Sequence, residues 1–244
     1  MSTKFWPILP AAGVGSRMQA ARPKQYLSLA GQFLIDHTLT TLLSYPAFEQ
    51  LVLVLSEQDS YWSQSQFFND KRIIQAAGGS ERCYSVLNGL KAIKDLAQAD
   101  DWVLVHDIAR PCLDHSDLDK LLKSLKEEAG SSGALLATPV RDSMKRGKIL
   151  DNRVANQQSI AVIDHSVERN QLWHALTPQV FRYQALYSAL ERCLADNKEV
   201  TDEASAMEYC GYQPLLVEGR GDNIKVTRPE DLALAEFFLT KKTT

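Results

Sequence analysis

The stretch that decides the fold is Leu9–Met18, LPAAGVGSRM, which runs from an apolar strand into a glycine loop that ends on an arginine. Pro23–Gln25 follows within two helical turns. A glycine loop after a strand can present backbone N–H groups to a polyphosphate. Arg17 and Lys24, just beyond the loop, can neutralise the charge of a phosphoryl group under attack. The pattern therefore indicates an enzyme that acts on a nucleoside triphosphate.

Two better-known phosphate loops fit this stretch less well. The P-loop pattern G-x-x-x-x-G-K-[ST] is missing, because no Gly-Lys-Ser or Gly-Lys-Thr occurs in the chain. The dinucleotide fingerprint G-x-G-x-x-G would need a glycine where Met18 stands. Its acidic partner would be Asp36, but Phe33–Leu39 is typical of a helix and not of a strand end. An ordinary turn, whose glycines serve only the bend, is the structural alternative.

The composition is that of a globular chain with a mildly acidic balance. The chain has 244 residues, 45% hydrophobic and 23% charged, with a formal net charge of −3. This length can bury one sizeable core, and the charge argues against a nucleic-acid partner. The four cysteines are scattered without a C-x-x-C pair, which favours reduced thiols and a cytoplasmic location. No signal-peptide pattern and no long uncharged apolar stretch is visible, so no membrane association is expected.

Short apolar runs alternate with helical spacing over the first 140 residues. Strands are predicted at 5–10, 51–55, 72–76, 102–105 and 134–137, and helices around 86–93 and 118–125. This alternation predicts an α/β fold, Rossmann-like and three-layered, with a mainly parallel twisted sheet. Ligands of such sheets bind beyond the carboxyl ends of the strands, where Gly13, Gly78–Gly79 and His106–Asp107 fall. We expect these three turns to meet at one edge.

The pattern breaks after Val140. Residues 141–156 are polar and turn-rich, and the segment from 141 to 167 is too short to bury a core of its own. We therefore interpret it as a protruding hairpin arm of a single domain, 1–244, with Ile160–Ile163 returning as a strand. Arms of this kind often exchange between the subunits of a symmetric dimer. A mobile surface loop is the alternative.

The remainder of the chain returns to helices and strands. A helix is predicted at 183–194 and a strand at 214–218. Thr201 is read as the N-cap of a further helix. Thr227 and Glu230 have the spacing of a capping box, and Pro229 suits the first turn of the last helix. These roles leave Lys225 without a structural explanation.

Further motifs along the chain resemble one family in their order and content. They are Val105–Pro111, Pro139–Lys145, Glu168–Trp173, Thr177–Gln179, Val200–Ser205 and Asp222–Thr227. With the glycine loop, they make essentially the whole chain similar to the 2-C-methyl-D-erythritol 4-phosphate cytidylyltransferases, a family of nucleotidyltransferases. The resemblance implies transfer of CMP from CTP to that acceptor, with release of pyrophosphate, in non-mevalonate isoprenoid biosynthesis. It also implies Mg²⁺ and a homodimer with 141–167 as the dimerisation arm.

The resemblance assigns catalytic roles to four residues. Arg17 and Lys24 match the pair that stabilises the transition state, at the α-phosphate and the leaving pyrophosphate. Lys225 and Arg169 match the residues that hold the acceptor, and Arg169 is expected to serve the partner subunit's substrate. The attacking phosphate is already ionised near neutral pH, so the reaction needs positioned cations and no general base.

The resemblance also assigns the nucleotide site. The residues matched to CTP are Ala11, Ala12, Gly13, Gly15, Gly79, Ser80 and Ser85. Ser80 stands where an aspartate is often found in the family, so we expect the base to be read through the backbone there. A helix N-cap is the alternative role of Ser80.

The residues matched to the acceptor are Asp107, Arg110, Ser143, Thr177 and Thr201. Asp107 either hydrogen-bonds the acceptor hydroxyls or approaches the metal; we favour the hydroxyls and expect His106 to be structural. No carboxylates cluster with ligand spacing, so Mg²⁺ is expected to be held mainly through the CTP phosphates. A cytidylyltransferase for another polyol phosphate, such as ribitol 5-phosphate, is the nearest alternative. A dinucleotide-binding oxidoreductase and a non-catalytic nucleotide-binding module are the alternatives from other classes.

Overall fold

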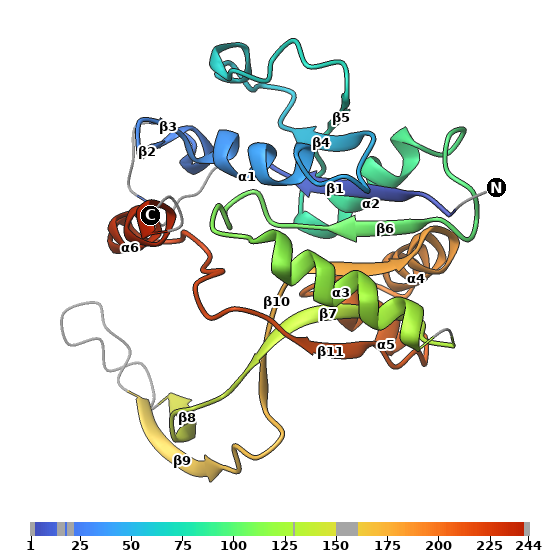
Figure 1. Cartoon of the computed structure of the whole chain (residues 1–244). Coiled ribbons are helices and arrows are strands. Elements are labelled where there is room, and N and C mark those ends of the chain that lie inside the picture. Colours follow the sequence, from blue (N-terminus) through green and yellow to red (C-terminus); the bar gives the residue numbers. More distant parts are fainter. Residues whose placement is uncertain (1–2, 14–17, 19–21, 129, 150–160, 242–244) are drawn as a thin grey trace.

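The structure, a computed structural model, describes residues 3–13, 18, 22–128, 130–149 and 161–241. Within these residues the centre is a seven-stranded sheet in the order β11-β7-β10-β6-β1-β4-β5 (Figure 1). The strands are β1 (Phe5–Pro10), β4 (Leu51–Leu55), β5 (Ile73–Ala77), β6 (Trp102–Val105), β7 (Gly133–Pro139), β10 (Trp173–Arg182) and β11 (Leu215–Glu218). Only β10 runs antiparallel to its neighbours in this sheet. The predicted α/β fold with a mainly parallel sheet is confirmed.

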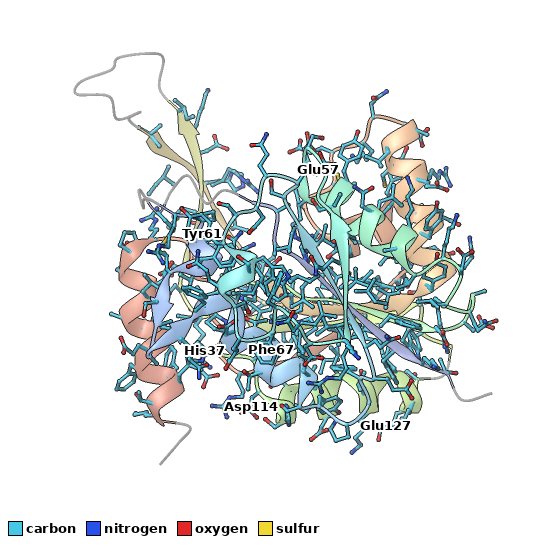
Figure 2. All side chains as sticks on the ribbon, turned by 90° about the horizontal axis from the view of Figure 1, so that it is seen from above. His37, Glu57, Tyr61, Phe67, Asp114 and Glu127 are labelled. Atoms are coloured by element: carbon cyan, nitrogen blue, oxygen red, sulfur yellow. The ribbon has the colours of Figure 1, made fainter. Side chains whose placement is uncertain are left out.

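Helices cover both faces of the sheet. They are α1 (Leu34–Leu43), α2 (Arg82–Ala92), α3 (His115–Glu127), α4 (Tyr183–Ala195), α5 (Glu203–Tyr209) and α6 (Pro229–Lys241). Because strand side chains alternate, Leu53 of β4 packs with α1 and α3, while Val52 and Val54 pack with α2 and α4. Figure 2 shows the side chains that fill the space between these layers. This is the expected three-layer arrangement, because a strand buried on both faces requires cover on both.

The predicted strands and helices of the first 140 residues are present, with small differences at their ends. The third strand lies one residue later than predicted, and the fifth is longer at both ends. Strand β10, which lies between β6 and β7, was not predicted. Its first residues are largely exposed and its last are buried, and its register shifts between Ala175 and Gln179. These breaks leave no continuous two-residue period for sequence reasoning to detect.

The cap predicted for α5 is wrong by one residue. The N-cap is Asp202, whose carboxylate accepts from the Ser205 N–H at 2.9 Å, and the Ser205 hydroxyl completes the capping box. Thr201 precedes this cap and is exposed. Thr201 and Asp202 both suit an N-cap, and the backbone path before α5 brings the Asp202 side chain to the free N–H group.

Two other predicted caps are also corrected. The Thr227 and Arg228 N–H groups donate to Asp231 and not to Glu230, although Pro229 does begin α6 as predicted. Ser80 is not an N-cap, because α2 begins at Arg82 and its preceding residue is Glu81. The backbone turn before each helix, which the sequence pattern does not specify, decides which side chain reaches the free N–H groups.

The arm segment forms a two-stranded antiparallel sheet of its own, β8 (Met144–Ile149) with β9 (Ala161–Val167). It stands apart from the central sheet (Figure 1). The predicted returning strand is present, starting at Ala161, and the tip at 150–160 lies outside the described residues. Ile149 and Ile163 leave 69% and 66% of their surface exposed. No helix among the described residues is long and apolar enough to cross a membrane.

Candidate active site

A cavity opens at the carboxyl ends of β1 and β6, beside the turn that leads into α2. It is lined by Pro10–Gly13, Lys24, Gln25, Gly79–Arg82, Ser85, Asp107–Ala109 and Lys225. The turns that the sequence predicted to converge are represented by Gly13, Gly79 and Asp107, so that prediction is confirmed. Parallel strands end at one edge of the sheet, which is why segments a hundred residues apart meet here.

Most of the residues predicted to bind CTP line this cavity. These are Ala11, Ala12, Gly13, Gly79, Ser80 and Ser85. Gly15 and the predicted catalytic Arg17 lie outside the described residues. Gln25 holds the start of the loop, because its buried side-chain amide donates to the Ala11 carbonyl at 2.8 Å. Sequence reasoning quoted Gln25 in a motif but gave it no role.

The glycine turn is packed tightly against the first turn of α2. A Cβ atom on Gly79 would lie 2.3 Å from the Cβ of Tyr84, so no larger residue fits without a backbone shift. The Ser85 hydroxyl accepts from the Gly79 N–H at 3.1 Å and donates to the Glu81 carbonyl at 3.1 Å. Ser85 therefore shapes the turn that borders the cavity.

Asp107 follows β6 and is surrounded by three cations. Its Oδ1 accepts from Arg82 Nε at 3.1 Å, and its Oδ2 lies 2.8 Å from Lys225 Nζ and 3.7 Å from Arg110 Nε. Burial raises the pKa of the Asp107 carboxyl, but the charges of Arg82 and Lys225 outweigh it and hold the pKa well below its ordinary value. Asp107 is therefore ionised and fixes Lys225 at the cavity wall.

Arg82 and Glu203 are a pair that the sequence did not reveal. Both terminal nitrogens of Arg82 contact the Glu203 carboxylate, at 2.6 and 3.0 Å, and Glu203 has no exposed surface. Burial raises the pKa of Glu203, although Arg82 opposes this effect. The sequence signal was present but ambiguous, because Glu203 is equally suited to the first turn of α5.

Lys24 joins the segment that carries Lys225. Its Nζ donates to the Val226 carbonyl at 3.3 Å, and both lysines line the cavity. Residues far apart in the sequence thus place two ammonium groups on the wall of one cavity. The two lysines predicted to be catalytic are brought together with the glycine loop.

His106 and Thr177 form a buried network beneath Asp107. The Thr177 hydroxyl accepts from the Asp107 N–H at 3.1 Å and donates to His106 Nδ1 at 3.0 Å, while His106 Nε2 contacts the Arg110 carbonyl at 3.2 Å. Burial lowers the pKa of His106 to about 4, so the ring is neutral. His106 is structural, as expected. Because the Thr177 hydroxyl is occupied within the protein, its contact with a substrate stays a prediction.

A second cavity adjoins the first. Arg110, Thr138, His174, Asn223 and Lys225 are among the residues that line it, and Lys225 lines both cavities. The Arg110 Nη1 donates to the Asn223 carbonyl at 2.7 Å, whereas Arg110 Nε and Asn223 Oδ1 are buried without a hydrogen-bond partner.

Four predicted site residues line neither cavity, and one of them is the buried Thr177. Ser143 and Thr201 are exposed, and the Arg169 guanidinium donates to the Arg141 carbonyl at the base of the arm. Their contacts with the acceptor stay predictions. Among the described residues, no three His, Cys, Asp or Glu side chains gather as a metal site.

The sheet, the glycine loop and the cations at one edge define an α/β protein of the nucleotidyltransferase class. The family model for 2-C-methyl-D-erythritol 4-phosphate cytidylyltransferase (IspD) matches residues 6–241. A Photorhabdus laumondii enzyme of that name is 51% identical, covering 96% of this chain and 94% of its own. One from Vibrio vulnificus is 50% identical, covering 98% and 96%. The Francisella tularensis crystal structure of that name has a TM-score of 0.80 at 33% identity, covering 97% of this chain and all of its own.

The chain therefore belongs to the 2-C-methyl-D-erythritol 4-phosphate cytidylyltransferase family. This membership confirms the nucleotidyltransferase class, the CTP-dependent reaction and the isoprenoid pathway that the sequence motifs indicated. It gives no support to the ribitol 5-phosphate, oxidoreductase or non-catalytic alternatives.

Proposed function

We propose that the two cavities hold CTP and 2-C-methyl-D-erythritol 4-phosphate side by side, and that Lys225 brings the reacting phosphates together. The observation that carries this proposal is the position of Lys225, which lines both cavities and is fixed by Asp107 at 2.8 Å. The glycine-loop residues border one cavity, and the buried guanidinium of Arg110 borders the other. Family membership supplies the identity of the two substrates.

The reaction needs charge stabilisation more than proton transfer. An ionised phosphate oxygen of the acceptor attacks the α-phosphorus of CTP, and the bond to the bridging oxygen of the β-phosphate breaks as pyrophosphate leaves. Both substrates are anions, so their repulsion is the main obstacle. Lys24 and Lys225, which both line the cavity, offset it. Arg17 is proposed as the partner of Lys24, on its sequence position alone.

The nucleotide is proposed to contact backbone groups more than side chains. Ala11, Ala12, Gly13 and Gly79 allow close approach because their side chains are small or absent. Gly15 is proposed to continue this loop. The base is assigned to the turn at Ser80, with Ser85 holding the Gly79 N–H in place.

We also propose that Mg²⁺ is held mainly through the CTP phosphates. Asp107 fits this reading, because its two oxygens already contact Arg82 and Lys225. When bound, the metal supplies neutralising charge for the triphosphate. Removal of divalent ions with EDTA is expected to abolish turnover, and MgCl₂ is expected to restore it.

The arm is proposed to join two protomers of a cytoplasmic homodimer. The exposed Ile149 and Ile163 support this, because large apolar side chains this exposed are typical of an interface. Ser143 and Arg169 lie at or near the base of the arm and are proposed to reach the acceptor in the partner subunit. Asp107, Arg110, Thr177 and Thr201 are proposed as acceptor contacts within the protomer.

The test is a transfer assay with radiolabelled CTP and two acceptors side by side, 2-C-methyl-D-erythritol 4-phosphate and ribitol 5-phosphate. The expected result is a labelled cytidine diphosphate product and stoichiometric pyrophosphate with the first acceptor only. Absence of product from the folded protein with Mg²⁺, or equal transfer to both acceptors, would contradict the proposal.

A further inference from the structure

Half-buried Arg82 lines the cavity and pairs with the fully buried Glu203, and neither residue has a role in the proposed reaction. We propose that this pair positions Lys225, the lysine proposed to meet the acceptor substrate. Glu203 holds Arg82 so that Asp107 keeps Lys225 in place. The inference rests on the proposed function, because it takes Lys225 as the group that meets the acceptor. Arg82 and Glu203 are then positioning residues for the family reaction.

The Arg82 guanidinium divides its donors between two carboxylates. An arginine side chain has five N–H groups in a rigid fork. Glu203 takes both terminal nitrogens of Arg82, at 2.6 and 3.0 Å, which leaves Nε to contact Asp107 Oδ1 at 3.1 Å. Asp107 Oδ2 therefore remains for Lys225 Nζ, at 2.8 Å. The contacts form one chain from Glu203 to Lys225.

Loss of Glu203 would change this division. Arg82, Arg110 and Lys225 would then face the single carboxylate of Asp107, and the terminal nitrogens of Arg82 would compete for its second oxygen. A bidentate guanidinium is the stronger partner of a carboxylate, so Lys225 would be displaced. A half-buried cation that loses its partner favours a new contact with the nearest carboxylate, which drives the rearrangement.

The pair also connects the two proposed substrate sites. Arg82 is the first residue of α2, three residues after Gly79 of the nucleotide turn. Glu203 is the first residue of α5, two residues after Thr201. One guanidinium therefore ties the turn assigned to CTP, the end of β6 and the helix start assigned to the acceptor. A substitution at Glu203 should therefore affect the position of Lys225 more than it affects the glycine loop.

The experiment uses Glu203→Gln, which keeps the shape and removes the charge, and Arg82→Lys, which keeps the charge and removes the fork. Both are compared with Lys225→Gln and with the double variant that combines Glu203→Gln and Lys225→Gln. KM for each substrate and kcat are measured in all variants, with thermal unfolding as a check of folding. If Glu203→Gln does not fold, Arg82→Lys and its combination with Lys225→Gln give the same readout.

We expect KM for the acceptor to rise about tenfold in both single variants, while KM for CTP changes less than threefold. The double variant should be no worse than Lys225→Gln alone in kcat/KM for the acceptor, because both changes remove one chain of contacts. Asp101→Asn is the matched control. It removes another buried carboxylate, at the opposite end of β6, and should leave both KM values unchanged.

The results separate this inference from the proposed function. If Lys225→Gln leaves acceptor kinetics unchanged, the assignment of the site fails. If Lys225→Gln impairs the acceptor but Glu203→Gln and Arg82→Lys do not, the positioning role alone fails. The inference would also be overturned if the losses of kcat/KM in the two single variants multiplied in the double variant, or if both KM values changed equally. Either result would show that the pair has a structural role only.

Discussion

Asp101 and Asp107 lie at opposite ends of β6, and both are buried, but their partners differ in kind. Asp101, at the amino end, accepts from the Lys4 N–H at 2.9 Å, the Trp6 indole at 3.0 Å and the Gln98 N–H at 3.0 Å. Asp107, at the carboxyl end, faces Arg82, Arg110 and Lys225 beside a cavity. The first carboxylate is held by neutral groups, and the second by cations.

The difference separates a structural carboxylate from a functional one. Neutral backbone and indole donors are rigid and satisfy Asp101 without offering charge to a ligand. The cations around Asp107 are long side chains whose charge can be shared with an incoming anion. Both carboxyls have a pKa below the ordinary value despite burial, so the direction of a pKa shift alone does not distinguish them.

The largest expected effect comes from removing one of the cations around Asp107. Lys225→Gln should lower kcat/KM for the acceptor by roughly 10²–10³, the cost found when a preorganised electrostatic donor is removed. Lys123→Gln is the control, because Lys123 pairs with Glu127 on the exposed surface of α3. Steady-state kinetics at saturating CTP measure the effect, and similar kinetics in the two variants would remove Lys225 from the reaction.

A smaller effect concerns how stability depends on pH at the two ends of β6. Burial lowers the pKa of His106 to about 4, so between pH 6.5 and 4 the unfolded chain binds a proton that the folded chain does not. This contribution is complete above pH 6.5 and is lost as the pH falls toward 4. The stabilisation from Asp101 is complete above about pH 4 and is lost only below it, because its pKa is lowered from the ordinary carboxyl value.

The measurement is urea unfolding at pH 7 and pH 5 for the native chain and His106→Gln. The native chain should lose about 2 kcal/mol more between these pH values than the variant does. Asp101→Asn should show the same pH difference as the native chain. Equal pH dependence in the native chain and His106→Gln would contradict a neutral buried imidazole.

The smallest expected effect concerns the contribution of Asp101 to stability. Asp101→Asn should lower the free energy of unfolding by about 1.5 kcal/mol, because one or more buried N–H donors lose their acceptor. The turnover number should stay within twofold of the native value, since no contact of Asp101 reaches the cavity. A loss of turnover without a loss of stability would show that the two ends of β6 are coupled.

Fold prediction worked where a segment's own pattern decides its structure. The run at 51–55 is apolar without alternation because it is buried on both faces, and it forms β4 as predicted. Strand β10 was missed because half of it is exposed and its register shifts. The cap of α5 was misplaced because Thr201, Asp202 and Ser205 are all good caps, and only the backbone path selects Asp202.

The sequence indicated which turns meet at the cavity but not which side chains pair beside it. Gly13, Gly79 and Lys24 were found because a turn or a cation at a fixed spacing carries its own signal. Arg82 and Glu203 lie 121 positions apart, and no local rule joins them. A buried carboxylate needs a cation or several hydrogen-bond donors, but the sequence does not show which glutamate is buried.

The sequence by itself determined the family, the reaction, the glycine loop and the mainly parallel sheet, because motif spacing and apolar period act over a few residues. Only the tertiary structure decided that Lys225 lines two cavities and that the Thr177 hydroxyl contacts His106. It also decided that the Glu203 carboxylate contacts both terminal nitrogens of Arg82. Those relations depend on strand order and on which side chains lose water together, and these properties arise only when distant segments pack.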